Sequence, residues 1–471
     1  MLPRLWGSGK FSAVDTKSLS FLKGLGVDAV WYTGLIRHAS LSSGEKVVKG
    51  DAGSPYAITD YYDVNPYLAD DAERRMEEFG DLVCRTHEAG LKFIMDFVPN
   101  HVAREYSGAA APGGIRPLGD GDDSSVHWKA ENDFYYYPGE ALRLPIASDY
   151  EEFPAKASGN AFTSAPGIND WWETVRLNYC PWPTPTWEKM YAVVRFWALK
   201  GVDGFRCDMV EMVPPEFMKW LIARIKHEFP SVVFIAEVYQ TDKYAFYVDE
   251  VGFDLLYDKS GLYDTLRKVL CDGLTAQAIS WNWQMLGDLQ PRMLNFLENH
   301  DEQRLASDFF AGKAENGYAA LAVSLLLNTA PFMLYFGQEV GERGMQAEGF
   351  SGLDGRTSIF DWCRVPALEH PDEKVLARYR EILSLAREKV FASGKTFDLG
   401  YCQGSGFNPD RHFAFLRSSG TDCRLVVANF GSDASVTVRI PPEALAYLGV
   451  KTRQTVVTLE VPGRDFAWTK L

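Results

Sequence analysis

The first 385 or so residues alternate between short β-rich runs and longer runs with apolar side chains at helical spacing. From Trp187 to Lys200 the apolar positions share one helical face, and Gly201 follows as the residue that ends the helix. Pro215 then begins a second amphipathic run. The continuous apolar run Ser231–Ala236 comes next and is typical of a strand buried on both faces. This alternation predicts a parallel sheet with crossover helices.

Further apolar runs of strand length occur along the same region. With a short, clipped candidate at the very start of the chain they make eight, which fits an α/β fold of the (β/α)₈ barrel type. The eight expected strands are Leu2–Leu5, Val27–Trp31, Leu91–Asp96, Gly201–Arg206, Ser231–Ala236, Phe253–Tyr257, Met293–Leu297 and Pro331–Tyr335.

Two regions depart from this alternation. Residues 102–185 are rich in Gly, Pro, Asp and aromatic side chains, and such a long excursion from a compact domain is usually functional. After about residue 390, period-two strands with turn signals predict an all-β sandwich. We therefore expect a barrel in two parts (1–101 and 186–388), a short inserted B-domain-like region (102–185) and a C-terminal β-sandwich domain (389–471).

Charge and composition narrow the function classes. The formal net charge of −15 disfavours nucleic-acid and membrane partners, and no segment approaches the roughly 18 consecutive apolar residues of a membrane helix. Seven cysteines without a CxxC pair indicate neither a disulfide framework nor a zinc cluster. The first residues contain no apolar signal-peptide core, which favours a cytoplasmic location, or a secreted or periplasmic one if a leader was removed. The oligomeric state is left open.

Charged side chains cluster where the expected strands end, which is where (β/α)₈ barrels carry their reactive groups. One carboxylate after a strand is most often a helix cap or a turn former. Four acidic sites at strand ends together indicate an active site. Two of them have a histidine nearby, and one has an arginine two residues away. These residues are Asp96 with Asn100 and His101, Arg206 with Asp208, Glu237, and His300 with Asp301.

The spacing of two of these carboxylates favours glycoside chemistry. Cleaving an acetal needs a proton donor for the leaving oxygen and a negative charge facing the oxocarbenium carbon. Asp208 and Glu237 lie one βα unit apart, and adjacent strands are roughly 4.8 Å apart, close to the roughly 5–5.5 Å separation of carboxyls in a retaining enzyme. Arg206 shares a strand face with Asp208 and should hold it ionised. Glu237 follows Phe234-Ile235-Ala236, an apolar setting that favours the protonated acid.

Four segments in order resemble the signature regions of the α-amylase family, glycoside hydrolase family 13. Two more segments resemble the family's second strand and the region near its eighth strand, so the resemblance covers nearly the whole chain. The signature-like segments are Asp96–His101, Gly204–Asp208, Ile235–Val238 and Phe296–Asp301, and the two others are Gly26–Trp31 and Pro331–Glu339.

The resemblance implies a role for each matched residue. It makes Asp208 the nucleophile, Glu237 the general acid/base and Asp301 the stabiliser of the transition state. It also implies a set of substrate-binding residues, in which Tyr56 stacks under the sugar of subsite −1. This set is Arg206, His101, His300, Tyr56, Asp96 and Arg304.

The chain departs from the family pattern in two places. Many members follow the nucleophile with a Lys-His pair, where this chain has Glu211-Met212. Arg176 stands where the family often has a calcium-binding aspartate, and a guanidinium cannot bind a hard cation that needs oxygen ligands. We therefore expect no required cofactor and no metal ligand, with structural calcium left open because Asn100 is kept while the usual site is altered. The acidic stretch Asp120–Asp123 is interpreted as a solvated turn.

The sequence thus predicts a retaining glycoside hydrolase acting on α-glucans or malto-oligosaccharides, at α-1,4 and by extension α-1,6 bonds. An α-glucan transglycosylase or an α-glucosidase of the same family is the nearest alternative. A catalytically silent sugar-binding or assembly protein would usually lack one of the three carboxylates, which are all present here. A metal-dependent hydrolase would need a third histidine beside His101 and His300.

Overall fold

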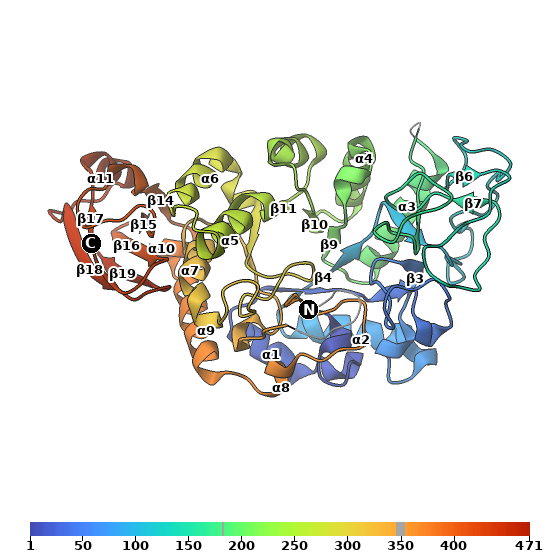
Figure 1. Ribbon diagram of the computed structural model, residues 1–471, viewed down its shortest axis with the longest axis horizontal. Helices are drawn as coiled ribbons and strands as arrows, with labels where there is room; N and C mark the ends of the chain where they lie inside the picture. The colour runs from blue at the N-terminus through green and yellow to red at the C-terminus, as the bar shows by residue number, and fades with distance from the viewer. Residues whose placement is uncertain (181–182, 345–353) are drawn as a thin grey trace.

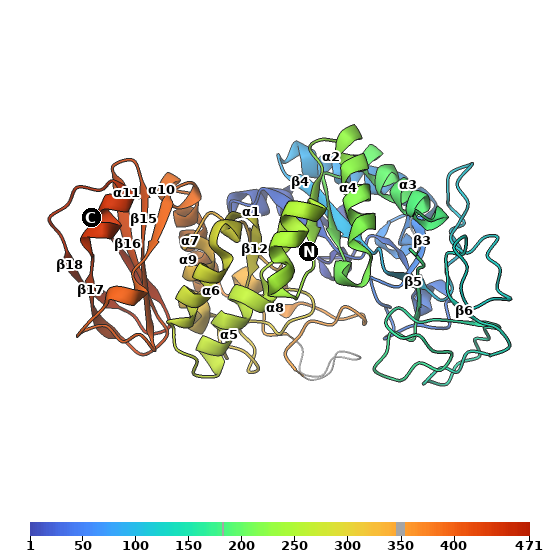
Figure 2. The same cartoon turned by 90° about the horizontal axis from the view of Figure 1, so that it is seen from above.

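The computed structural model describes residues 1–180, 183–344 and 354–471. The molecule is elongated, with the curled parallel sheet and its helices in the middle, the inserted region at one end and the C-terminal sheets at the other (Figure 1). The view turned by 90° gives the same order (Figure 2). Within the described ranges no helix has the length and apolar character needed to cross a bilayer.

The central sheet has seven parallel strands among the described residues, and its strands follow the chain order of the predicted barrel. Seven of the eight sequence-predicted strands are confirmed, with each end within three residues of its predicted position. In sheet order the strands are β1 Ala29–Tyr32, β4 Lys92–Phe97, β9 Gly204–Cys207, β10 Val233–Ala236, β11 Leu255–Tyr257, β12 Met293–Phe296 and β13 Phe332–Met333.

Helices connect these strands and lie along the outside of the sheet, with α1 and α2 in the lower part of Figure 1 and α4 and α6 at the upper edge. The two helices expected from the sequence begin at Pro185 and Pro215, and Gly201 after the first has a φ of 93°, as a residue ending a helix requires. The helices are α1 Thr16–Gly24, α2 Arg75–Glu88, α3 Pro185–Leu199, α4 Pro215–Glu228, α5 Asp264–Cys271, α6 Ala278–Leu286, α7 Tyr318–Leu326, α8 Pro366–Glu369 and α9 Glu373–Ala386.

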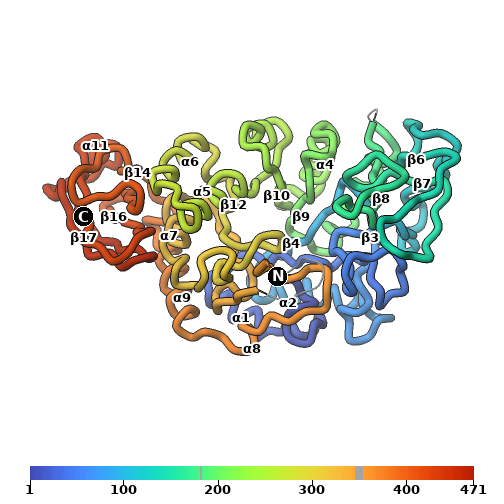
Figure 3. The backbone as a smooth tube through the Cα atoms, in the orientation of Figure 1, coloured from blue at the N-terminus to red at the C-terminus, as the bar shows by residue number. Residues whose placement is uncertain are grey.

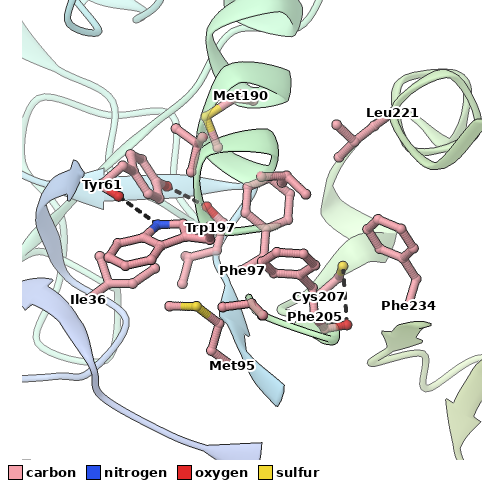
Figure 4. Close-up of a cluster of buried hydrophobic side chains, with 14 of the residues drawn as sticks. Ile36, Tyr61, Met95, Phe97, Met190, Trp197, Phe205, Cys207, Leu221 and Phe234 are labelled. Carbon is pink, nitrogen blue, oxygen red and sulfur yellow. Dashed lines mark hydrogen bonds between the residues drawn. The ribbon is translucent and has the colours of Figure 1, made fainter. Parts of the chain in front are cut away.

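Packing of α3 against the sheet builds part of the core that holds β4 and β9 in place. Trp197 of α3 lies against Phe97 and Met95 of β4, with Phe205 of β9 beside them (Figure 4). The indole Nε1 of Trp197 donates to the carbonyl oxygen of Tyr61 at 2.8 Å, so the buried polar atom has a partner. The ends of β4 and β9 that follow this core carry Asp96 and Arg206.

The expected strand at Leu2–Leu5 is wrong. Pro3–Leu5 forms a 3₁₀ helix that begins at a proline, whose fixed φ and missing N–H are unsuited to a ladder strand. Only Met1 pairs with the sheet: its amino group donates to the oxygen of Trp31 at 2.7 Å, and the amide of Thr33 donates to the oxygen of Met1 at 2.9 Å. The sheet is therefore curled but not closed between β1 and β13 in the described residues.

The inserted region contains only short strands among its described residues. It is held to the barrel by β5, His101–Ala103, which pairs with β8, Thr174–Arg176, so that His101 lies opposite Arg176. A second small pair is β6, Tyr136–Tyr137, with β7, Ala155–Lys156, and the loop between β1 and α2 forms the hairpin of β2, Ile36–His38, with β3, Ile58–Val64.

The C-terminal region forms two antiparallel sheets and thereby confirms the predicted all-β region. One sheet has the order β14-β15-β16-β19 and the other pairs β17 with β18. The elements are β14 Lys395–Asp398, β15 His412–Ser419, β16 Asp422–Asn429, β17 Ala434–Arg439, β18 Val456–Val461 and β19 Phe466–Lys470, with α10 Lys389–Ala392 and α11 Pro442–Leu448.

Arg417 of β15 joins this region to the barrel. Its fully buried guanidinium donates to the carbonyl oxygen of Leu327, just after α7, at 3.0 Å and to that of Val390 in α10 at 3.3 Å. It also donates to Phe391 in the same helix. The positive charge is thus placed at the carboxyl ends of two helices, where unpaired carbonyl oxygens favour a cation.

Candidate active site

The polar side chains predicted at strand ends do come together. Asp96 lies opposite Arg206 in the pairing of β4 with β9, and Arg206 lies opposite Ile235 in the pairing of β9 with β10. Because the strands are parallel, Asp208 and Glu237 extend from the same edge of the sheet. Asp208 is 6 % exposed and Glu237 is 3 % exposed, so both carboxyls are buried at this edge.

Arg206 is the central cation of the site. Its guanidinium is fully buried, and Nη1 donates to Oδ1 of Asp208 at 2.7 Å. Nη2 lies 2.8 Å from Oε1 of Glu237, while Nε donates to the hydroxyl of Tyr257 at 3.2 Å. Burial opposes the charged form, but Glu237, Tyr257 and the other acidic groups around it raise the pKa of Arg206 well above its ordinary value. One guanidinium therefore holds both carboxylates in a fixed arrangement.

Glu237 has a more polar environment than the apolar run before it indicates. Its Oε2 accepts a hydrogen bond from the amide of Met209 at 2.9 Å, and its Oε1 accepts one from the hydroxyl of Tyr239 at 2.9 Å. Met209, directly after Asp208, has a φ of 45°, a left-handed conformation that is uncommon for a residue with a side chain. This turn points the Met209 amide at Glu237 and ties the two strand ends together.

Asp208 shares its cation with a second carboxylate. Burial raises the pKa of Asp208 from 3.8 to about 7, with Arg206 acting in the opposite direction and Glu237 in the same direction. Burial thus outweighs the effect of Arg206, so the ionised form of Asp208 expected from the sequence is less favoured than its contact with the guanidinium alone would make it.

Asp301 differs from this pair because it is open to the solvent side, with 44 % of its side chain exposed. Its Oδ2 lies 3.0 Å from Nε2 of His300, and the same nitrogen lies 2.6 Å from the hydroxyl of Tyr56. Removal from bulk water acts to raise the pKa of Asp301, but His300 and the nearby arginines lower it to about 2. The Tyr56 ring stacks on the His300 ring with 5.4 Å between centroids.

Asp96 and His101 complete the buried wall of the site. Both carboxylate oxygens of Asp96 are buried without a hydrogen-bond partner among the described residues, and its nearest cation is Nη1 of Arg206 at 3.7 Å. Burial raises the pKa of Asp96. His101 is 3 % exposed, its pKa is lowered by burial to about 3, and its ring lies 5.1 Å from that of Trp171. A buried carboxylate without a hydrogen-bond partner and, separately, a neutral imidazole are both groups that can bond sugar hydroxyls.

The side chain of Arg304 is surrounded by other protein groups. It is fully buried, and its Nη1 donates to Oε2 of Glu298 at 3.0 Å and to the oxygen of Phe336 at 2.8 Å. Its Nε donates to the hydroxyl of Thr357 at 2.8 Å, and its guanidinium lies 4.1 Å from the ring centre of Tyr335. These contacts fix the loop after β12 that carries Asp301, and substrate binding by Arg304 stays a prediction.

The residues at the altered calcium position do not fit a hard cation. Arg176 donates to the carbonyl oxygen of Gly159 at 3.3 Å and to that of Met212 at 3.1 Å, and Nδ2 of Asn100 donates to the same oxygen of Gly159 at 2.9 Å. The oxygens that would face a metal ion thus already accept hydrogen bonds. In residues 1–180, 183–344 and 354–471, no group of three or more His, Cys, Asp or Glu side chains is arranged to hold a metal.

Carboxylates of the acidic stretch Asp120–Asp123 accept hydrogen bonds from other residues of the inserted region. Asp122 accepts from the amides of Asp133 and Phe134, and Asp123 accepts from Ser125. Asp122 is half-buried and joins two segments of the inserted region, so the solvated turn expected from the sequence describes only part of this stretch.

Three aromatic residues of the site were missed by the sequence reasoning. Trp31 and Tyr257 lie at the ends of β1 and β11 and contact Arg206, with 5.5 Å between the guanidinium carbon and the ring centre of Trp31. Tyr239 follows Glu237 by two residues. The sequence contains a signal for each of them. Trp31 and Tyr257 lie at the ends of expected strands, and Tyr239 is two residues from a candidate acid, but an aromatic side chain at such a position is also typical of a core.

Comparison with known proteins adds a family match to this geometry. A family model described as the catalytic domain of alpha-amylase matches residues 7–378. The chain is 27% identical to alpha-amylase MalA of Haloarcula japonica over 445 residues, which cover 92% of this chain and 54% of that protein. The chain thus spans about half the length of this curated relative.

Solved structures share the fold. A noncanonic maltogenic alpha-amylase, AmyB, from Thermotoga neapolitana superposes with a TM-score of 0.68 at 21% identity, covering 100% of this chain and 95% of that chain. The cyclic alpha-maltosyl-(1→6)-maltose hydrolase of Arthrobacter globiformis, in complex with its cyclic saccharide, superposes with a TM-score of 0.71 at 19% identity, covering 98% of this chain and 90% of that one. At these identities the likeness establishes the fold alone.

Proposed function

The chain belongs to the α-amylase family, and from this premise we propose that it hydrolyses α-glucans or malto-oligosaccharides with retention of anomeric configuration. The observation that carries the proposal is the ion-paired arrangement of Asp208 and Glu237 on one buried guanidinium, with Nη1 2.7 Å from one carboxylate and Nη2 2.8 Å from the other. A double displacement needs two carboxyls on neighbouring strands, and the pairing of β9 with β10 places Asp208 and Glu237 in this way.

In the first step of the proposed reaction, Glu237 gives its proton to the glycosidic oxygen while a carboxylate oxygen of Asp208 forms a bond to the anomeric carbon. The bond between that carbon and the leaving oxygen breaks, and the shortened glucan leaves as an alcohol. In the second step Glu237 takes a proton from water, the water oxygen attacks the anomeric carbon, and Asp208 leaves as a carboxylate. Asp301, ionised above a pKa of about 2, faces the positive charge that develops at the sugar ring.

The remaining groups hold the sugar in place for these steps. Tyr56 offers an aromatic face beside the catalytic carboxylates, because its ring centre lies 5.3 Å from the Arg206 guanidinium. Asp96 accepts hydrogen bonds from sugar hydroxyls that replace the water it has lost, and His101 and His300 contact the same ring. The substrate bonds we propose are α-1,4 linkages and, by extension, α-1,6 linkages.

We propose further that this activity requires no calcium ion. Arg176 supplies a fixed positive charge where a metal would otherwise join the inserted region to the loop after Asp208, since it bonds both Gly159 and Met212. Asn100 contributes to the same junction through Gly159.

The test is a product analysis on starch, maltoheptaose, maltotriose, pullulan and sucrose, with the anomeric form of the first product followed by proton NMR. We expect α-anomeric products from the wild-type chain and at least about a thousandfold lower kcat for Asp208→Asn, the size of loss seen when a covalent nucleophile is removed. The matched control is Asp120→Asn on the exposed loop, which should keep full activity.

Unchanged turnover by Asp208→Asn, or β-anomeric products, would contradict the proposal. Chain-lengthened or rearranged sugars would instead assign the chain to the transglycosylases of the family. Binding of maltoheptaose by the wild-type chain without any turnover would favour a silent sugar-binding protein.

A further inference from the structure

The residue after Asp301 is held by an element that carries none of the site residues described so far except Tyr257 at its start. Asp301 lies in the loop that follows β12, and Glu302 comes next. Both oxygens of the Glu302 carboxylate have a partner: Nζ of Lys259 lies 3.3 Å from Oε1, and the hydroxyl of Tyr263 donates to Oε2 at 3.1 Å. Lys259 and Tyr263 are the first and last residues of one π-helical turn that follows β11. This turn therefore holds the loop of Asp301 at a single carboxylate.

The two side chains that bind Glu302 are themselves fixed by the core and by a helix. The Tyr263 ring is 1 % exposed and stacks on Phe296 of β12, with 4.9 Å between centroids and 15° between planes. Nζ of Lys259 also lies 3.0 Å from Oδ1 of Asp264, the first residue of α5. The turn contacts both α5 and β12, and these two labels mark its place in the chain trace (Figure 3).

The turn is tightly packed at its centre. A Cβ at Gly261 would collide with the carboxylate of Asp258 and come within 2.7 Å of the side-chain nitrogen of Asn282, so only glycine fits there. Asp258 is 1 % exposed, and the amide of Tyr263 donates to its carbonyl oxygen at 3.0 Å. Single π-helical turns are rare and occur frequently at functional sites. Buried contacts thus fix the position from which this turn reaches Glu302.

The direction of the Asp301 carboxylate depends on the main chain beside it. The Asp301 side chain is 44 % exposed, and in the part of the chain that the structure describes its ion-pair partner is His300. Oδ1 of Asn299 accepts hydrogen bonds from the amides of Asp301 at 2.8 Å and of Glu302 at 2.9 Å. Asn299 therefore holds this short segment at one end and the Glu302 carboxylate holds it at the other.

Lys259 also pairs the negative charge that stands next to Asp301. Burial acts to lower the pKa of Lys259, but Asp264 and Glu302 raise it above its ordinary value, so the ammonium stays charged. Two neighbouring carboxylates in one loop would repel each other if neither had a cation. The pairing of Glu302 with Lys259 turns that carboxylate away from its neighbour.

We propose that Glu302, bound by Lys259 and Tyr263, is a positioning residue that directs the Asp301 carboxylate toward the anomeric carbon. This inference rests on the proposed function, because it takes Asp301 as the group that faces the developing positive charge. Stabilisation of such a charge depends on a preorganised group, so a displaced Asp301 acts less on the transition state while the uncharged substrate binds as before. The expected effect of losing Glu302 is a lower kcat at a nearly unchanged KM.

The kinetic test compares two variants of Glu302. Glu302→Ala removes both contacts, whereas Glu302→Gln keeps the shape and one acceptor oxygen. We expect kcat on maltoheptaose to fall at least about tenfold for Glu302→Ala and by no more than about threefold for Glu302→Gln, with KM within about twofold of the wild-type value for both. The matched control is Glu250→Ala, which removes an exposed carboxylate that lies 3.6 Å from Lys219 and should leave kcat unchanged.

A second measurement follows the position of Asp301 without any turnover. Burial acts to lower the pKa of His300, but the Asp301 carboxylate raises it above its ordinary value. If Glu302 holds Asp301 in place, Glu302→Ala should lower the pKa of His300 by at least about 0.5. NMR titration of the chain with ¹³C-labelled histidine measures this, and His300→Gln identifies the resonance. Tyr263→Phe, which removes one hydroxyl only, should shift the same pKa in the same direction and replaces Glu302→Ala if that variant does not fold.

An unchanged pKa of His300 in these variants would overturn the proposal, whatever the kinetics. A raised KM with unchanged kcat would mean that Glu302 acts on substrate binding, and would overturn it as well. If the wild-type chain hydrolyses no α-glucan, the proposed function fails. A lowered pKa of His300 in the same variants would even then support the positioning of Asp301 by Glu302.

Discussion

The hydroxyl of Tyr239 donates a hydrogen bond to Oε1 of Glu237 across 2.9 Å, from a residue only two positions further along the chain. Tyr239 is 37 % exposed, so its ring lies between the buried acid and the open side of the site. The hydroxyl restricts the rotation of the Glu237 carboxyl, whose second oxygen is already held by the amide of Met209. We propose that Tyr239 positions Glu237, the proposed general acid/base.

Replacing Tyr239 with phenylalanine removes this bond and keeps the ring. A hydrogen bond contributes about 0.5–1.5 kcal/mol, and we expect kcat to fall by up to roughly tenfold because other contacts of Glu237 remain. KM should change little. The steady-state kinetics of Tyr239→Phe on maltoheptaose test this, with Tyr191→Phe on the surface of α3 as the matched control. A change in KM alone would mean that Tyr239 only binds substrate.

The pH profile should reflect the burial of Asp208. Since the nucleophile must be ionised and burial raises its pKa to about 7, kcat/KM is expected to rise with pH through this region. Asp301, with a pKa of about 2, stays ionised over the whole range and should not limit the rate. A profile that is flat down to pH 4 would contradict this assignment.

The same shift makes a prediction about stability. A carboxyl that ionises near 3.8 when unfolded and near 7 when folded binds more protons in the folded state, so ionisation of Asp208 costs stability as pH rises between these values. Asp208→Asn lacks this titration. Its Tm relative to the wild type should therefore be higher at pH 8 than at pH 5. An equal difference at both pH values would count against the shifted pKa.

Adding a chelator tests whether a guanidinium or a metal ion joins the inserted region to the loop after Asp208. We expect EDTA or added calcium to change the Tm of the wild-type chain by less than about 1 °C, because Arg176 already occupies the carbonyl oxygens of Gly159 and Met212. Arg176→Ala should lower the free energy of unfolding by about 1–3 kcal/mol by leaving these oxygens unpaired.

The matched control for that experiment is Arg143→Ala, an exposed arginine of the same inserted region. Differential scanning calorimetry with and without EDTA provides the measurement. A calcium-dependent rise in the Tm of the wild-type chain would show that a metal site exists despite Arg176.

Arg304 and Glu298 form a fully buried ion pair that should support the loop of Asp301. Removing one partner leaves an unpaired charge, so Arg304→Met is expected to cost about 3–5 kcal/mol of stability. The double variant Arg304→Met with Glu298→Leu should recover a large part of that loss. Urea unfolding of the single and double variants tests the coupling; additive losses would mean that the two side chains do not stabilise the fold as a pair.

Much of the fold could be predicted from periodicity because the barrel strands are buried on both faces. The run Ser231–Ala236 is apolar throughout, and β10 is found within it. The strand expected at Leu2–Leu5 does not form for a physical reason: Pro3 has no N–H to donate to a ladder, and pairing there involves Met1 alone. The strands that do form have the same apolar pattern whether or not the sheet closes, so the open edge could not be predicted from the sequence.

The site could be predicted as a set of residues but only partly as an arrangement. Strand-end position and period two placed Arg206 beside Asp208, because both effects are local to one strand. The environment of Glu237 could not be read from its neighbours in sequence, since its contacts with Met209 and Arg206 come from another strand. Such contacts depend on how strands align, which a single sequence does not encode in its local pattern.

The buried guanidinium of Arg417 has a consequence for how the molecule unfolds. It satisfies carbonyl oxygens that belong to the barrel helix α7 and to α10, and it comes from the second strand of the C-terminal sheet. If the C-terminal sheets were to separate, those oxygens and the cation would all lose their partners at once. The two regions are thereby made thermodynamically interdependent, so heating should produce one cooperative transition, and a catalytic fragment without the C-terminal sheets would not be an independently folding unit.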